Sequence, residues 1–322
     1  MKALVTGGTG FIGGHAVDLL LKENHAVRLF SRRPDIPEGL RGKNVEVFKG
    51  DLENFQSVID AMHGMEVFYH IGEIKNVNRA ASEKNVKLMG HIIENLKDKK
   101  VRRLVFISSI TAAGIPSEIP AREDTEPEAI LKDHYTSYKR ACEKLITDKA
   151  SGVEYVIVRP APVYGPGSRY LGRLINTVER IGPIGLPFIG DARNLAPLIY
   201  VKDLARAIFL SGMRSDAAGQ VFNLTDGQRH SWFEFLNTIA ESLGKKLRII
   251  PLSPLFLRIP AIFFDLFSGI FGIELDLSNY TTYFSRDLFF ENSKAKNLLG
   301  WEPEFTLNNG VREMIKGYKR LD

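Results

Sequence analysis

Short apolar runs alternate with amphipathic stretches through the first half of this 322-residue chain. Stretches such as 54–62 and 85–99 place apolar residues three and four apart, which indicates helices. The apolar runs have the length of buried strands, and in chain order they are 2–6, 25–30, 45–50, 65–72, 101–109 and 153–160. Strand, helix, strand at this rhythm predicts right-handed crossovers and a doubly wound, parallel α/β sheet.

The rhythm loosens after Pro160. Residues 166–194 are rich in glycine and proline, and the amphipathic stretch 230–244 predicts a helix. We therefore expect a smaller, mostly helical C-terminal domain beside the sheet domain. The predicted sheet domain comprises 1–165 and 198–225, and the predicted smaller domain comprises 166–197 and 226–322.

Composition narrows the class of protein. A hydrophobic share of 44% and a charged share of 25% are ordinary for a globular enzyme. Cys142 is the one cysteine, so no intrachain disulfide can form, and the N-terminus has no signal-peptide pattern. The net charge of +5 is scattered, so we expect mild attraction for anions but no nucleic-acid partner. The seven histidines lack metal-ligand spacing, so no metal is expected. A cytoplasmic location is also predicted.

Glycines follow the first predicted strand directly and open the first predicted helix. The stretch TGGTGFIG places Gly7 at the tight turn, Gly10 where the backbone would approach a pyrophosphate, and Gly13 where helix and strand pack. A helix N-terminus also presents free N–H groups to phosphate oxygens. This arrangement predicts a Rossmann-type dinucleotide-binding domain.

The end of the second predicted strand bears on the choice of dinucleotide. NAD sites usually carry an acidic residue there, but this chain has Ser31, Arg32 and Arg33. A guanidinium can bind a 2′-phosphate in a bidentate manner, so NADP is the expected cofactor and NAD is the alternative. After the third strand, Asp51 and Leu52 are placed to contact the adenine, although a surface turn is the other interpretation.

Tyr135 and Lys139 lie four residues apart in a predicted helix, so both side chains share one face. A tyrosine with a reference pKa of about 10 needs a shift of ~3 units to work near neutral pH. A lysine ammonium ~4 Å away contributes roughly that much, whereas burial acts in the opposite direction. Ser108 and Ser109 end the fifth predicted strand on the same sheet edge and offer a hydroxyl to a substrate oxygen.

These residues together resemble an extended short-chain dehydrogenase/reductase, closest in pattern to 3β-hydroxysteroid dehydrogenases and dihydroflavonol reductase-like members. The resemblance includes TGGTGFIG, FISSITAAG, YTSYK and VRPAPVYGPG, and it continues through IYVKDLARAI, VFNLTDGQ and SKAKNLLGWEPEF. It implies a catalytic trio of Ser109, Tyr135 and Lys139. It also implies a set of cofactor-binding residues, namely Gly7, Gly10, Phe11, Ile12, Gly13, Asp51, Leu52, Ile71, Gly72, Lys75 and Pro160. One departure is the run 85–89, where Leu88 and Met89 replace the family's small residues.

The same resemblance bears on the substrate. Sugar-nucleotide epimerases usually carry Phe-Asn where this chain has Ala161 and Pro162, and an arginine where it has Ala196. An oxidoreductase that acts on a carbonyl or secondary alcohol of a largely apolar, sterol-like substrate is therefore expected. A nucleotide-sugar 4-epimerase or dehydratase is the alternative, with Arg169 or Arg173 as a substitute clamp. A non-catalytic dinucleotide-sensing protein is an alternative of another class.

Residues 254–275 are dense in Phe, Leu and Ile but are interrupted by charged residues, proline and glycine, so they are a poor membrane span. Three interpretations stand: a buried helix pair, an apolar lid, and a helix in a membrane interface that would make the protein peripheral to a membrane. A small-molecule substrate and a homodimer complete the expectations for partners.

Overall fold

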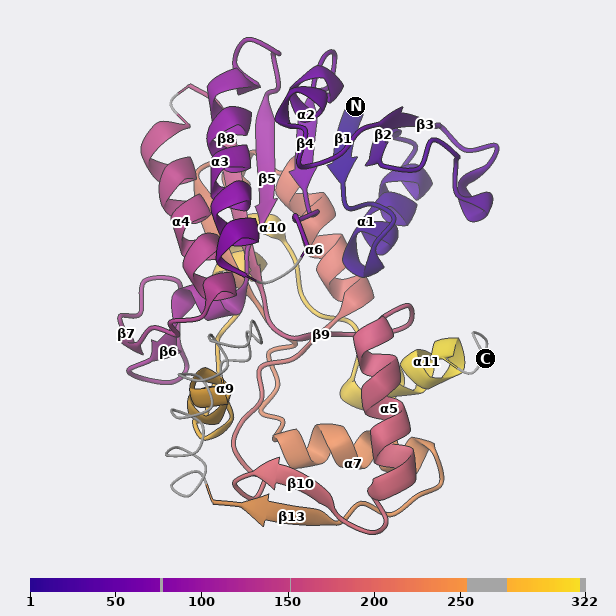
Figure 1. Cartoon of the computed structure of the whole chain (residues 1–322), viewed down its shortest axis with the longest axis vertical. Coiled ribbons are helices and arrows are strands. Elements are labelled where there is room, and N and C mark those ends of the chain that lie inside the picture. The colour runs from indigo at the N-terminus through magenta and orange to yellow at the C-terminus, as the bar shows by residue number, and fades with distance from the viewer. Residues whose placement is uncertain (76–77, 151, 254–276, 319–322) are drawn as a thin grey trace.

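A seven-stranded sheet forms the centre of the computed structural model, which describes residues 1–75, 78–150, 152–253 and 277–318 (Figure 1). All of its strands are parallel, in the order β12-β8-β5-β4-β1-β2-β3. The strands are β1 (Lys2–Thr6), β2 (Ala26–Ser31), β3 (Val45–Lys49), β4 (Val67–His70), β5 (Arg103–Ile107), β8 (Glu154–Pro160) and β12 (Gln220–Leu224). The predicted doubly wound Rossmann-type sheet is confirmed.

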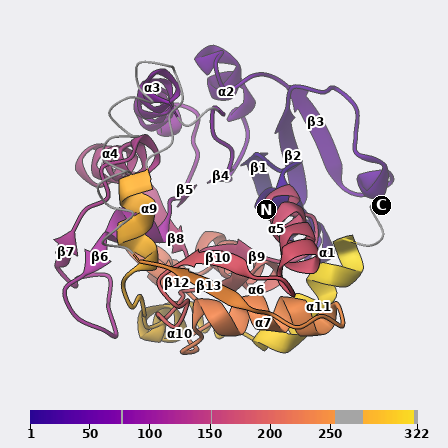
Figure 2. The same cartoon turned by 60° about the horizontal axis from the view of Figure 1, so that its bottom comes forward.

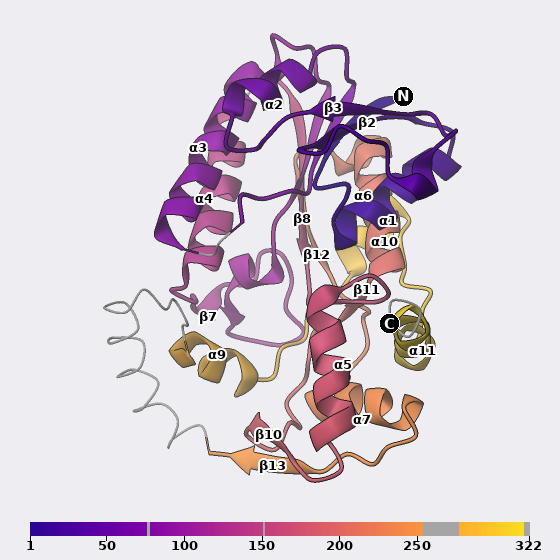
Figure 3. The same ribbon diagram turned by 45° about the vertical axis from the view of Figure 1, so that its right-hand side comes forward.

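Helices cover both faces of this sheet (Figure 3). On one face, α1 (Phe11–Lys22) packs against α6 (Val201–Met213). The other face carries α2 (Phe55–Ala61), α3 (Arg79–Leu96) and α4 (His134–Lys149). Alternate residues of β1 serve the two cores: Ala3 and Val5 are buried with α1, and Leu4 is buried with α3. This alternation is the period-2 geometry of a strand buried on both sides.

Two elements differ from the predicted pattern. The strand β12 had no counterpart among the predicted strands, yet it pairs along its whole length with β8. The helix α3 begins at Arg79, six residues before the predicted start at residue 85, because the Asn78 side chain caps it by accepting a hydrogen bond from the Ala81 N–H at 2.8 Å.

A second layer lies below the carboxyl ends of the strands (Figures 1 and 2). Its helices are α5 (Arg169–Ile181), α7 (Trp232–Ser242), α9 (Leu277–Phe284) and α11 (Leu307–Tyr318), and its parallel strand pair is β10 (Leu186–Ile189) with β13 (Ile249–Leu252). A capping box between Ser231 and Glu234 starts α7. The buried residues of α5, α7 and α11 pack together in a third hydrophobic core, which lies in this second layer.

Short elements lie between the longer helices and strands. They are the strand pairs β6 (Ile115–Pro116) with β7 (Pro127–Ala129) and β9 (Val163–Tyr164) with β11 (Ile199–Tyr200), and the single turns η1 (Glu38–Leu40), η2 (Ile110–Ala113) and η3 (Ser215–Ala217). One further helix, α10 (Ser293–Leu299), packs against α6 and β12. Trp301 follows α10 and is fully buried in the hydrophobic core that also contains Ala3 and Val5 of β1. Its Nε1–H donates to the Asp203 carbonyl at 2.9 Å. Residues 293–301 thus pack on the sheet, although the predicted boundary at 226 assigned them to the smaller domain.

The interpretations of residues 254–275 concern a segment that lies outside the described residues. Within the ranges that are described, no helix has the length and apolar content needed to cross a bilayer.

Candidate active site

Every residue predicted for the site lines one cleft of about 2750 Å³ at the carboxyl ends of the strands. A doubly wound sheet binds its ligand at this edge. The residues that the structure brings together here are Gly7, Gly10, Phe11, Ile12, Gly13, Ser31, Arg32, Asp51, Leu52, Ile71, Gly72, Lys75, Ser109, Tyr135, Lys139 and Pro160. Their individual roles in binding remain predictions.

The turn after β1 has the geometry that a pyrophosphate requires. Gly7 has a φ of +70°, and a Cβ there would lie 2.6 Å from the Gly72 nitrogen. The N-cap of α1 is Gly10, whose lack of a side chain leaves the first helical N–H groups without a side-chain cap. Those N–H groups and the positive end of the helix dipole suit a phosphate group. The residues present therefore fit a dinucleotide.

The far end of the cleft holds the residues predicted to select the adenosine half. Ser31 Oγ accepts a hydrogen bond from the Arg33 N–H at 3.1 Å, which shapes the turn after β2. Arg32 and Arg33 are exposed and line the cleft, so their guanidinium groups are accessible to a ligand. Asp51 turns one carboxylate oxygen toward the Glu53 N–H at 3.0 Å.

The opposite end of the cleft holds the tyrosine and the lysine on α4. Asp133 caps this helix by accepting from the Thr136 N–H at 2.7 Å, which fixes its first turn. Lys139 is 4% exposed, and its Nζ donates to the Ile107 carbonyl at 2.8 Å. The same Nζ lies 5.5 Å from the centre of the Tyr135 ring. The predicted pairing of these two side chains on one helix face is present.

The pKa of Tyr135 differs in direction from the expectation. Burial raises the pKa of Tyr135, the Lys139 ammonium lowers it, the Glu73 carboxylate raises it, and a hydrogen bond with Ser109 lowers it. The net direction is upward, so the predicted fall toward neutral pH is not found in the protein alone. Lys139 acts in the predicted direction, but burial together with a carboxylate that the prediction did not include outweighs it.

The structure distinguishes the two serines that end β5. Ser108 Oγ donates to Glu143 at 2.5 Å, and Glu143 forms a salt bridge of 2.6 Å with Arg159. The Ser108 hydroxyl is therefore engaged in a buried hydrogen bond. Ser109 caps η2, and its Oγ accepts from the Thr111 hydroxyl at 3.0 Å beside the cleft. Ser109 is therefore the hydroxyl available to a ligand.

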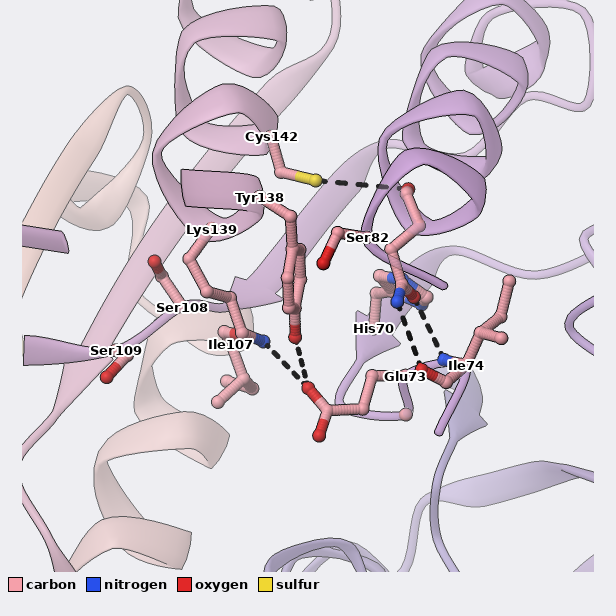
Figure 4. Close-up of polar contacts among 12 residues, drawn as sticks. His70, Glu73, Ile74, Ser82, Ile107, Ser108, Ser109, Tyr138, Lys139 and Cys142 are labelled. Atoms are coloured by element: carbon pink, nitrogen blue, oxygen red, sulfur yellow. Dashed lines mark hydrogen bonds and ion pairs between the residues drawn. The ribbon is translucent and has the colours of Figure 1, made fainter. Parts of the chain in front are cut away.

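Glu73 and Tyr138 also belong to this end of the cleft, and the sequence analysis missed both. The Tyr138 hydroxyl donates to Glu73 Oε2, and Lys139 Nζ lies 3.6 Å from the same oxygen (Figure 4). Glu73 lies three residues after the end of β4, at the carboxyl edge of the sheet. An acidic residue at that edge was the available signal, because parallel sheets build their sites there.

The half of the cleft that is lined by residues of the second layer and the connections to it is uncharged. Among described residues, the lining from Pro160 onward contains no Asp, Glu, Lys or Arg side chain. Aromatic and aliphatic side chains dominate it, including Tyr164, Leu171, Leu174, Phe188, Leu198, Trp232, Phe235, Leu236, Tyr283 and Phe284. Arg173, considered above as a substitute clamp, is exposed on α5 and does not line the cleft.

Comparison with known proteins identifies the family. Residues 3–225 match the model of the NAD dependent epimerase/dehydratase family. A 3β-hydroxysteroid-dehydrogenase/decarboxylase isoform 2 of Arabidopsis thaliana is 28% identical over 99% of this chain, which spans 62% of that plant protein. A UDP-glucose 4-epimerase of Vibrio cholerae is also 28% identical, over 98% of this chain and 94% of its own length. The crystal structure of a Thermotoga maritima UDP-glucose 4-epimerase with UDP-glucose has a TM-score of 0.78, with 21% identity over 100% of this chain and 99% of that one.

The chain therefore belongs to the NAD-dependent epimerase/dehydratase family, and the predicted membership of the extended short-chain dehydrogenases/reductases is confirmed. Its relatives include 3β-hydroxysteroid dehydrogenases as well as nucleotide-sugar epimerases. They support an NAD(P)-dependent enzyme, either an oxidoreductase or an epimerase.

Proposed function

We propose that this protein is an NAD(P)-dependent oxidoreductase that interconverts a ketone and a secondary alcohol on a largely apolar substrate. The observation that carries this proposal is the uncharged aromatic half of the cleft beside Tyr135. A sterol-like ring system would bury its surface there at about 25 cal/mol per Å² of apolar area removed from water. The steroid dehydrogenases among the relatives support the same substrate class.

The geometry on α4 and β5 supports the following catalytic roles. In reduction, the Tyr135 hydroxyl donates its proton to the carbonyl oxygen, and in oxidation its phenolate takes that proton back. Lys139 stabilises the phenolate from the same helix face, and Ser109 orients the substrate oxygen by hydrogen bonding. The dinucleotide, when bound, supplies or accepts the hydride at the carbon of that same group.

For the cofactor, we propose NADP in preference to NAD. Arg32 lies at the end of β2 with its guanidinium exposed at the cleft, and among described residues it forms no ion pair. A 2′-phosphate would therefore meet an available cation. The predicted adenine contacts of Asp51 and Leu52 are part of the same proposal.

A nucleotide-sugar substrate fits this cleft less well. Its diphosphate carries about two negative charges, and burying unpaired charges costs several kcal/mol each. The described substrate-side lining offers no cation in compensation, and Ala161 and Ala196 are buried small residues. A 4-epimerase remains the second candidate because the Vibrio cholerae enzyme covers nearly the whole chain.

Isothermal titration of the NADP-loaded protein distinguishes the two candidates. We expect an apolar ketone such as a 3-ketosteroid to bind to the NADP-loaded protein. In a separate assay with NADPH, the same ketone should be reduced to the alcohol as NADPH is oxidised. UDP-glucose should give no heat at the same concentrations. Micromolar binding of UDP-glucose without any response to apolar ketones would replace this proposal with the epimerase.

Three further expectations accompany this function as predictions. They are a cytoplasmic location, a homodimer, and contact of residues 254–275 with a membrane surface. Equilibrium centrifugation would test the homodimer, and co-sedimentation with anionic vesicles would test the membrane contact.

A further inference from the structure

The Glu73 carboxylate contacts both Lys139 and a second tyrosine, Tyr138. Glu73 Oε2 accepts the hydroxyl hydrogen of Tyr138 and lies 3.6 Å from Lys139 Nζ. In Figure 4 the Glu73 side chain reaches under the ends of both side chains from the loop after β4. The Lys139 ammonium therefore lies near the Glu73 carboxylate as well as near the Tyr135 ring.

The loop that carries Glu73 is held on both sides. Before it, the Gly72 N–H donates to the Thr6 carbonyl at 3.1 Å. After it, the buried Asn85 side chain accepts from the Ile74 N–H at 2.9 Å and donates to the Ile74 carbonyl at 3.1 Å. Asn85 thereby fixes the backbone next to Glu73, so the carboxylate has a defined place rather than a free surface position.

Other titratable groups lie on the elements packed against this cluster. Burial lowers the pKa of His70, on β4, to about 3, so its imidazole is neutral near neutral pH. Burial raises the pKa of the Cys142 thiol, on α4, to about 12, so it is protonated. Asp133, the N-cap of α4, adds a smaller negative influence on Tyr135 than Glu73 does. Glu143, one turn along α4 from Lys139, forms a salt bridge with Arg159.

We propose that Glu73 is a positioning residue that holds Lys139 and offsets its charge, so that Tyr135 keeps its proton to a higher pH. The proposal rests on the proposed function, because it assigns the direction that the site serves. A protonated Tyr135 is the form that donates to a carbonyl, so Glu73 widens the pH range of reduction and narrows that of oxidation. The site is thus set up as a ketone reductase.

Glu73→Gln removes one negative charge that acts on Tyr135, and solvent screens that charge in part. Because Glu73 is partly exposed to solvent, we expect a shift of about one pH unit when its charge is removed.

The test is the pH profile of the Glu73→Gln variant, which keeps the shape and an acceptor for Tyr138 but removes the charge. The pH at which alcohol oxidation reaches half its maximum should fall by about one unit, and the loss of ketone reduction at high pH should begin earlier by the same amount. Tyr138→Phe, which keeps the Glu73 charge, should show a much smaller shift. Glu83→Gln removes an exposed carboxylate of α3 paired with Arg79 and should leave the profile unchanged.

A second measurement does not depend on turnover. The tyrosinate absorbance of each protein, minus that of the same protein carrying Tyr135→Phe, reports the titration of Tyr135 itself. Its midpoint should be lower in Glu73→Gln than in the parent. An unchanged midpoint would overturn the role of Glu73, whereas a lowered midpoint in a protein that turns over no ketone or alcohol would overturn only the proposed function.

Discussion

A Cβ added at Gly13 would lie 2.2 Å from the carbonyl oxygen of Gly7. The first turn of α1 therefore packs directly on the backbone turn that follows β1. One residue later a side-chain carbon fits, because a Cβ at Gly14 would lie 3.8 Å from the Gly8 carbonyl oxygen, an ordinary van der Waals distance. Two adjacent helical glycines thus meet very different surroundings.

This contrast gives a matched pair of variants. Gly13→Ala should displace the helix N–H groups from the pyrophosphate position and weaken cofactor affinity by about tenfold or more, the equivalent of one charge-assisted hydrogen bond. Gly14→Ala should bind the cofactor normally and stabilise α1 by about 0.5–1 kcal/mol. Fluorescence titration with NADPH measures the first effect, and urea unfolding measures the second. Equal affinities in the two variants would contradict the assigned role of Gly13.

Tyr135→Phe should leave cofactor affinity nearly intact and lower kcat by about 100-fold or more, the scale of lost general acid–base catalysis. The reason is that the hydroxyl is the proposed proton carrier, whereas the ring contributes packing. Lys139→Ala should reduce kcat and also move the pH profile upward, because the ammonium lowers the pKa of Tyr135. Steady-state kinetics across pH with an apolar ketone measure both. A Phe variant with parental kcat would remove Tyr135 from the mechanism.

The local pattern of the sequence predicted six of the seven strands of the sheet, and the family resemblance supplied most of the residues that line the site. The strand–helix alternation and the glycines after β1 are short-range signals, so β1, α1 and their turn follow from them. The strand β12 escaped prediction because its burial arises from pairing with β8, which is distant in the chain. Long-range contacts of this kind leave no local signature.

The net pKa of Tyr135 could not be predicted for a similar reason. The helix spacing gave the Lys139 contribution, but the burial of Tyr135 and the approach of Glu73 depend on how β4 and α4 meet in space. Glu73 and Lys139 lie 66 positions apart in the sequence. Only the tertiary structure brings their charges together.

Arg32→Ala should erase much of the preference for NADPH over NADH. A lost charge-assisted contact with the 2′-phosphate is worth roughly 1.5–3 kcal/mol, or about tenfold to a hundredfold in affinity. The affinity for NADH should hardly change, because NADH has no phosphate at that position. Titration of both proteins with both cofactors measures this difference. Equal affinities of the parent for NADPH and NADH would refute the assignment of Arg32.

The Asp226 carboxyl group is buried with one oxygen left without a hydrogen-bond partner. Oδ1 accepts from the Gln228 N–H at 3.0 Å, whereas Oδ2 accepts no hydrogen bond from the described residues and lies 3.7 Å from His230 Nε2. Burial, with a contribution from Asp203, raises the pKa of Asp226 to about 7. An unfolded aspartate ionises near ~3.9, so between these values the folded state binds more protons than the unfolded state.

Asp226 therefore makes the free energy of unfolding decrease as pH rises from about 4 to 7 and remain level above that. Asp226→Asn keeps the oxygen that accepts from Gln228 and removes the ionisation. The variant should match the parent near pH 4 and exceed its stability at pH 8 by up to about 4 kcal/mol, since three pKa units correspond to that energy. Urea unfolding of both proteins at the two pH values measures the difference. The exposed Asp216→Asn on η3 serves as the control and should show no such gain, and equal stabilities of parent and Asp226→Asn at pH 8 would show that Asp226 is ionised at no cost in the folded protein.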